Sequence, residues 1–128
     1  MAGSRLAAPR RVAATLIFVL ALSACGQAHV VGGDRTLRMA LTEYRLHPQD
    51  VRVSAGPLAI FVHNYGRLTH SLTLSIDGLG AGSTGPLLPG QSTELVVYLT
   101  PGRYVMASTI LSDQALGEYG ALTVTPSS

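Results

Sequence analysis

Four polar side chains in the later part of the chain could do chemistry: His70, Ser108, Asp113 and Glu118. One imidazole and two carboxylates form a donor set that suits zinc, iron or manganese and leaves coordination positions open. Ser108, His70 and Asp113 could instead act as nucleophile, base and orienting acid. The chain has no G-x-S-x-G nucleophile elbow and no obvious oxyanion hole. We therefore predict that the protein is not an enzyme.

The only cysteine, Cys25, follows a segment that is typical of a secretory signal peptide. Three arginines precede an apolar run of eleven residues, 12–22, which is too short to cross a membrane. The sequence Leu-Ser-Ala-Cys at 22–25 resembles the bacterial lipobox, which implies cleavage before Cys25 and attachment of lipid to its sulfur. An ordinary secretory signal is the alternative. Arg10 and Arg11 also suggest twin-arginine export, although the residues that follow match that signal poorly.

These features divide the chain into three parts. Residues 1–24 are predicted to be a lipoprotein signal peptide, residues 25–35 the lipidated cysteine and a flexible tether, and residues 36–126 one domain. This organisation predicts a lipid-anchored protein on the outer, extracytoplasmic face of the cell membrane. With its sulfur alkylated, Cys25 would leave no free thiol in the domain.

From the charge balance, we do not expect nucleic acid to be a partner. All nine basic residues are arginine, and after Cys25 six of them stand against seven acidic residues, so the formal net charge there is about −1. A domain with that balance has no basic excess with which to hold a phosphate backbone. The partners that we expect are the bacterial membrane, through the lipid anchor, and an unidentified envelope protein or metal ion.

From residue 36 onward, short runs rich in β-forming residues are separated by glycine and proline. About seven strands are predicted, within residues 36–46, 50–54, 57–64, 70–76, 92–99, 102–109 and 119–124. No segment favours a helix, and the glycine-rich stretch 77–90 is predicted to be a mobile connection. This pattern indicates an all-β fold, a Greek-key β-sandwich.

The alternation of side chains along a strand places the polar candidates. His70 has the parity of Leu72, and Ser108 has the parity of Met106, so both are expected to point inward near a strand end. His63 is out of phase with its apolar neighbours and is expected to face solvent.

Residues 44–74, YRLHPQDVRVSAGPLAIFVHNYGRLTHSLTL, are similar to the first half of the cupredoxins, the small β-sandwich proteins of blue-copper electron transfer. In that family N-x-G-x-x-x-H delivers the first copper histidine, and Asn64, Gly66 and His70 match it. We expect Asn64 to fix the loop before His70 through bonds from its side chain to the backbone. Residues 87–106 resemble the family's next strand, turn and strand, so the resemblance covers nearly all of the domain.

The cupredoxins then continue with a copper-ligating cysteine, a histidine five residues later and a methionine five residues after that. Read without gaps, this chain has Ser108, Asp113 and Glu118 at those positions, before a closing G-x-L-x-V strand at 120–124. Type 1 copper needs a thiolate, and a serine hydroxyl cannot replace it near neutral pH. We therefore expect a cupredoxin-like domain that lacks a type 1 copper site.

Two functions follow from this resemblance. The first is a membrane-anchored envelope lipoprotein without a cofactor, acting as a non-catalytic binding or accessory protein, with Asp113 and Glu118 as solvated loop residues. The alternative is a protein that binds copper, iron or zinc through His70, Asp113 and Glu118, the remnant of the copper site.

Overall fold

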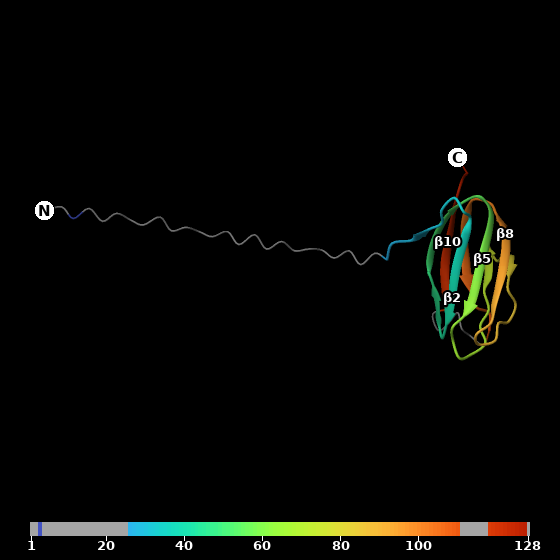
Figure 1. The fold of residues 1–128 in the computed structure, drawn as a ribbon. Helices are drawn as coiled ribbons and strands as arrows, with labels where there is room; N and C mark the ends of the chain where they lie inside the picture. Colours follow the sequence, from blue (N-terminus) through green and yellow to red (C-terminus); the bar gives the residue numbers. More distant parts are fainter. Residues whose placement is uncertain (1–2, 4–25, 111–117, 128) are drawn as a thin grey trace.

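The computed structural model describes Gly3, residues 26–110 and residues 118–127. They form two packed sheets (Figure 1), one of six strands in the order β1-β4-β10-β9-β6-β7 and one of four in the order β3-β2-β5-β8. The strands are β1 (His29–Val30), β2 (Thr36–Thr42), β3 (Arg45–His47), β4 (Asp50–Ser54), β5 (Gly56–Asn64), β6 (Thr73–Ile76), β7 (Leu79–Ser83), β8 (Ser92–Leu99), β9 (Gly102–Ala107) and β10 (Tyr119–Thr125). The predicted all-β sandwich is confirmed. Within the described ranges, no helix has the length and apolar character that a membrane crossing requires.

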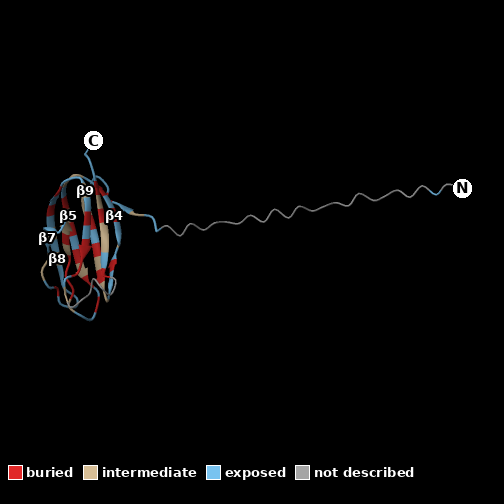
Figure 2. Ribbon diagram, turned by 180° about the vertical axis from the view of Figure 1, so that it is seen from behind, coloured by how far each residue is buried: buried red, intermediate tan, exposed pale blue. Residues whose placement is uncertain are grey.

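The core lies between the two sheets. Buried and exposed residues alternate along β4 and along β9 as far as Met106 (Figure 2), because successive side chains of a strand point to opposite faces of the sheet. The buried side chains are mostly aliphatic: Val31, Leu37, Met39, Leu41, Leu46, Val51, Val53, Leu58, Ile60, Val62, Leu72, Leu74, Leu87, Val97, Leu99, Tyr104, Met106, Leu122 and Val124. All of them lie between residues 31 and 124, so a protein that begins at residue 26 retains the whole core.

The structure has more strands than the sequence predicts. The predicted tether contains β1, which pairs in parallel with β4, and Val31 beside it is buried. The glycine-rich stretch 77–90, predicted to be a mobile connection, contains β7, which pairs with β6. Gly82 lets this strand lie close to the other sheet, because a Cβ there would be 2.7 Å from Cγ1 of Val97. The absence of a side chain thus serves packing at this edge.

Strand direction brings distant segments together at one end of the sandwich. β5 and β9 end there and β10 begins there, while the C-terminal end of the chain lies at the opposite end (Figure 1). The residues that meet at this end are Glu43, Gly66, His70, Ser108 and Glu118, and we call this cluster the His70 pole. Its members come from the turn after β2, the loop after β5 and the residues that flank the loop between β9 and β10.

Candidate functional site

The centre of the His70 pole is a contact between His70 and Glu118. Nδ1 of His70 lies 2.8 Å from Oε2 of Glu118, and neither side chain is exposed to solvent. The backbone of His70 is fixed by an isolated bridge: its N–H donates to the carbonyl of Leu87 at 3.1 Å, and the N–H of Leu87 donates back at 2.7 Å. A buried imidazole is therefore held against a buried carboxylate, within hydrogen-bonding distance.

Ser108 belongs to the same cluster, one residue after the end of β9. It is 1% exposed, and its backbone N–H donates to the carbonyl of Glu118 at 3.2 Å. Its Oγ accepts hydrogen bonds from the backbone N–H groups of Ser71 at 3.2 Å and Ile110 at 3.4 Å. The hydroxyl therefore joins the loop before β6 to the loop after β9.

Glu43 approaches His70 from the other side. Its Oε1 lies 3.7 Å from Nε2 of His70 and accepts hydrogen bonds from the backbone N–H groups of Arg67 and Leu68. The N–H of Arg67, then that of Leu68, hold the pKa of this carboxyl below its ordinary value, because they stabilise the charged form. The imidazole of His70 thus has a carboxylate near each of its nitrogens, one buried and one partly exposed.

Two residues of the predicted N-x-G-x-x-x-H motif build the loop around the imidazole. Asn64 is fully buried, and its amide donates to the carbonyls of Leu68 at 2.8 Å and Leu87 at 2.9 Å, while its oxygen accepts from the N–H of Gly66. A Cβ on Gly66 would lie 2.5 Å from Oε1 of Glu43 and 2.8 Å from Nε2 of His70. Glycine at this position therefore permits the close approach of the side chains of Glu43 and His70.

The structure places the predicted residues as follows. His70, Ser108 and Glu118 lie together and buried, whereas Asp113 and Cys25 fall outside the described residues. The interpretation of Glu118 as a solvated loop carboxylate is wrong, because its contact with His70 draws it into the interior.

Sequence reasoning missed Glu43. It lies in the turn between β2 and β3 and accepts a hydrogen bond from the N–H of Arg67, which is 24 residues later in the sequence. No sequence motif marks that contact.

Type 1 copper does not fit the residues that the pole provides. Such a site needs a cysteine thiolate, two imidazoles and a weak axial ligand, but the only cysteine of the chain is Cys25. The residue that follows β9 is Ser108, whose hydroxyl oxygen accepts backbone hydrogen bonds. Within the described ranges, no three His, Cys, Asp or Glu side chains gather closely enough to hold a metal ion.

Comparisons with known proteins identify the fold. No protein-family model matches the chain, and no curated protein matches its sequence. Solved structures do match.

A reduced auracyanin from Roseiflexus castenholzii is 21% identical, with a TM-score of 0.66 over 74% of this chain and 100% of that one. Auracyanin A, described as a "blue" copper protein of Chloroflexus aurantiacus, is 15% identical, with a TM-score of 0.63 over 75% of this chain and 99% of that one. An azurin from Methylomonas sp. strain J is 10% identical, with a TM-score of 0.62 over 70% of this chain and 97% of that one. Identities this low establish the architecture alone. The domain therefore has the cupredoxin fold, and its described residues lack the thiolate that type 1 copper requires.

Proposed function

We propose that the protein is an envelope lipoprotein, anchored through Cys25, whose cupredoxin-fold domain is a binding module without redox or catalytic chemistry. The anchor is supported by the single cysteine at the end of an apolar, arginine-led segment. Because that thiol would carry lipid, the domain itself would contain none.

The observation that carries the binding role is the contact between His70 and Glu118. Nδ1 of the imidazole is engaged at 2.8 Å by a carboxylate that is itself fully buried. Ser108 completes the cluster as a hydrogen-bond acceptor for two backbone N–H groups. An arrangement of this kind fixes three loops in one geometry, as a scaffold for recognition needs, and it supplies no group that could carry an electron at a physiological potential.

One observation favours a second candidate, metal binding at His70, Asp113 and Glu118. An imidazole nitrogen and a carboxylate oxygen lie side by side, and both are ligands that zinc and iron accept. Two ligands of a tetrahedral ion, each about 2.1 Å from it, lie about 3.4 Å apart. The pair would therefore have to open by roughly 0.6 Å relative to its 2.8 Å contact to admit such an ion.

The two candidates separate by metal titration of the protein purified from residue 26. Copper, zinc and ferrous iron are titrated separately by calorimetry, and bound metal is measured after dialysis. Our proposal predicts no saturable heat, no thermal stabilisation by metal and no blue colour with copper. Saturable binding that is lost in Glu118→Gln and kept in Glu94→Gln, an exposed carboxylate, would establish the second candidate instead. Far-ultraviolet circular dichroism of each variant verifies that it is folded.

The anchor is tested separately in cells. Wild-type protein should incorporate a labelled fatty acid and sediment with membranes, and Cys25→Ser should do neither. Unchanged labelling or unchanged membrane retention of Cys25→Ser would contradict the lipoprotein assignment. The result does not depend on what the domain binds.

A further inference from the structure

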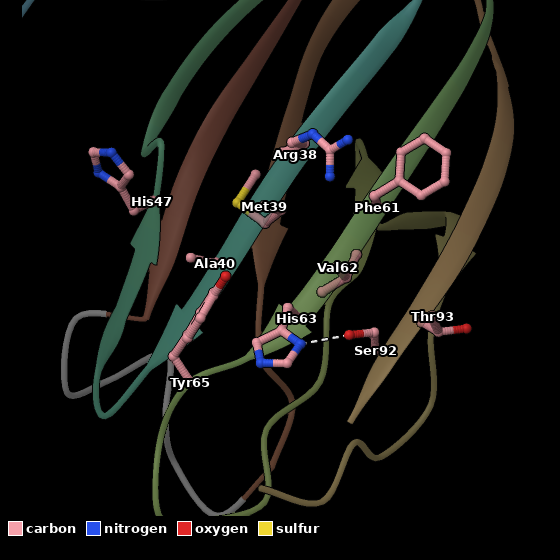
Figure 3. Close-up of a pocket in the computed structure, with 10 residues that line it drawn as sticks. All are labelled: Arg38, Met39, Ala40, His47, Phe61, Val62, His63, Tyr65, Ser92 and Thr93. Atoms are coloured by element: carbon pink, nitrogen blue, oxygen red, sulfur yellow. Dashed lines mark hydrogen bonds between the residues drawn. The ribbon is translucent and has the colours of Figure 1, made fainter. Parts of the chain in front are cut away.

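The outer face of the four-stranded sheet carries a hollow of about 500 Å³, separate from the buried His–Glu contact. Sites for small molecules commonly measure about 300–1,000 Å³. Its lining comes from β2, β3, β5, the first residues of β8 and Tyr65, which follows β5 (Figure 3). The hollow therefore has the size of a ligand site and rests on strands, which hold its side chains in fixed relative positions.

Strand register explains the shape of the hollow. Ala40 of β2 is aligned with His47 of β3 on one side and with His63 of β5 on the other. The alanine methyl forms a low floor between two imidazoles on neighbouring strands. Figure 3 shows the side chain of Tyr65 extending toward Ala40, which bounds the floor at one end.

Aromatic side chains form the walls. The rings of His63 and Tyr65 are 4.1 Å apart between centroids and tilted by 59°. Nδ1 of His63 is hydrogen-bonded to Oγ of Ser92, which fixes the orientation of the imidazole (Figure 3). Phe61 lies one row further along the same face and is 38% exposed. Walls of this kind favour a planar ligand that can stack against them.

The charge of the lining favours an anion. Arg38 gives the hollow a permanent positive charge, His47 and His63 add imidazole nitrogens, and among the described residues no acidic side chain lines it. The guanidinium carbon of Arg38 lies 5.7 Å from the centroid of the Phe61 ring. Within the described ranges this guanidinium makes no hydrogen bond or ion pair, in contrast to that of Arg35, which donates to Ser54 and Pro57. A cation of this kind beside an aromatic wall can pair with a planar carboxylate through two parallel N–H donors.

We propose that this hollow binds a small aromatic carboxylate, with its ring against Phe61 and Tyr65 and its carboxylate on Arg38. The inference names a ligand class for the binding role proposed above and rests on that role. Its site is distinct from the His70 pole, so the metal titration and the anchor test do not decide it. Glu94 of β8 is aligned with Phe61 but does not line the hollow. Its carboxylate places a negative charge outside the hollow on that side.

The test uses 2-naphthoate with the protein purified from residue 26, followed by the backbone amide signals in nuclear magnetic resonance spectra. We expect saturable shifts that cluster on β2, on β5 and at Ser92 and Thr93, and a weaker response to the neutral analogue 2-naphthalenemethanol. Arg38→Gln should weaken the affinity about tenfold or more, whereas Arg45→Gln removes the same charge from an exposed site on β3 outside this hollow and should change it less than about twofold.

A steric variant tests the floor without altering charge. Ala40→Leu should abolish binding, and Ala59→Leu, at a position on the same outer face that does not line the hollow, should leave it intact. The absence of saturable shifts up to about 10 mM 2-naphthoate, ten times the Kd of a weak millimolar site, would overturn the proposal. Equal effects of the two arginine variants would overturn it as well, because binding would then follow net charge alone.

Discussion

Removal of one partner from the buried pair of His70 and Glu118 should cost far more than removal of both. The two side chains meet at 2.8 Å, and neither is exposed. Replacing one partner of a buried polar contact by an apolar side chain leaves the other group with a desolvation penalty of about 1–3 kcal/mol, and more for a charged group. Replacing both partners by apolar groups of similar shape can be nearly neutral. The contact therefore adds little net stability, but the loss of one partner from it is costly.

We expect Glu118→Leu and His70→Leu each to lower the free energy of unfolding by about 1–3 kcal/mol. The double variant should remain within about 1 kcal/mol of wild type, because both polar groups of the contact are then replaced together. Urea unfolding of the protein from residue 26 measures these values, provided that the dependence on urea keeps a constant slope. Glu94→Leu, which removes an exposed carboxylate, is the control and should change the stability by less than about 0.5 kcal/mol.

Two outcomes would refute this reasoning. The first is a double variant that loses the sum of the two single losses, because the side chains would then act independently. The second is a loss of less than about 1 kcal/mol in each single variant, since a buried polar group that loses its partner in this contact should cost at least that much. If a leucine variant does not fold, Glu118→Gln, which keeps the shape and one carbonyl acceptor, gives a smaller loss in the same direction.

Two further predictions concern the carboxylate on the other side of the ring. Gly66→Ala should destabilise the domain by about 1–3 kcal/mol, because the added Cβ would lie 2.5 Å from Oε1 of Glu43 and 2.8 Å from Nε2 of His70. The control in thermal unfolding is Gly80→Ala, whose added Cβ meets nothing within 4 Å. Equal effects of the two variants would contradict the steric explanation. The N–H of Arg67 lowers the pKa of Glu43, so the folded protein binds a proton at this carboxylate more weakly than the unfolded chain does. The stability that results is present above the pKa of the unfolded state, and it is lost as the pH falls through the pKa of the folded state. Glu43→Gln should therefore flatten the fall of Tm below about pH 4.5, and an unchanged acid profile would show that this carboxylate does not contribute to it.

The sequence predicts the sandwich and the inward direction of two polar residues because both depend on a period of two. His70 and Ser108 share parity with core residues, and they are 0% and 1% exposed. His63 is out of phase with the core and lines the outer face of its sheet, as its parity predicts.

The rest of the site depends on contacts between segments that are distant in the sequence. Glu118 precedes β10 and shares the parity of the buried Leu122 and Val124, but a carboxylate at such a position is not expected to be buried, and its contact with an imidazole 48 positions earlier accompanies that burial. Glu43 is a turn residue whose acceptor role depends on two amides of another loop. The glycine-rich β7 has few β-forming residues, and it is a strand because β6 offers it a pairing edge and because its small residues fit against β8.

The early start of the sandwich would limit how far a domain lipidated at Cys25 could stand from a bilayer. β1 begins at His29 and is held in parallel against β4. With Cys25 lipidated as proposed, only residues 26–28 would separate the acyl chains from the first strand. Fully extended, three residues span about 10–11 Å. The domain would then lie directly against the lipid headgroups. Any ligand would therefore have to be bound close to the membrane surface.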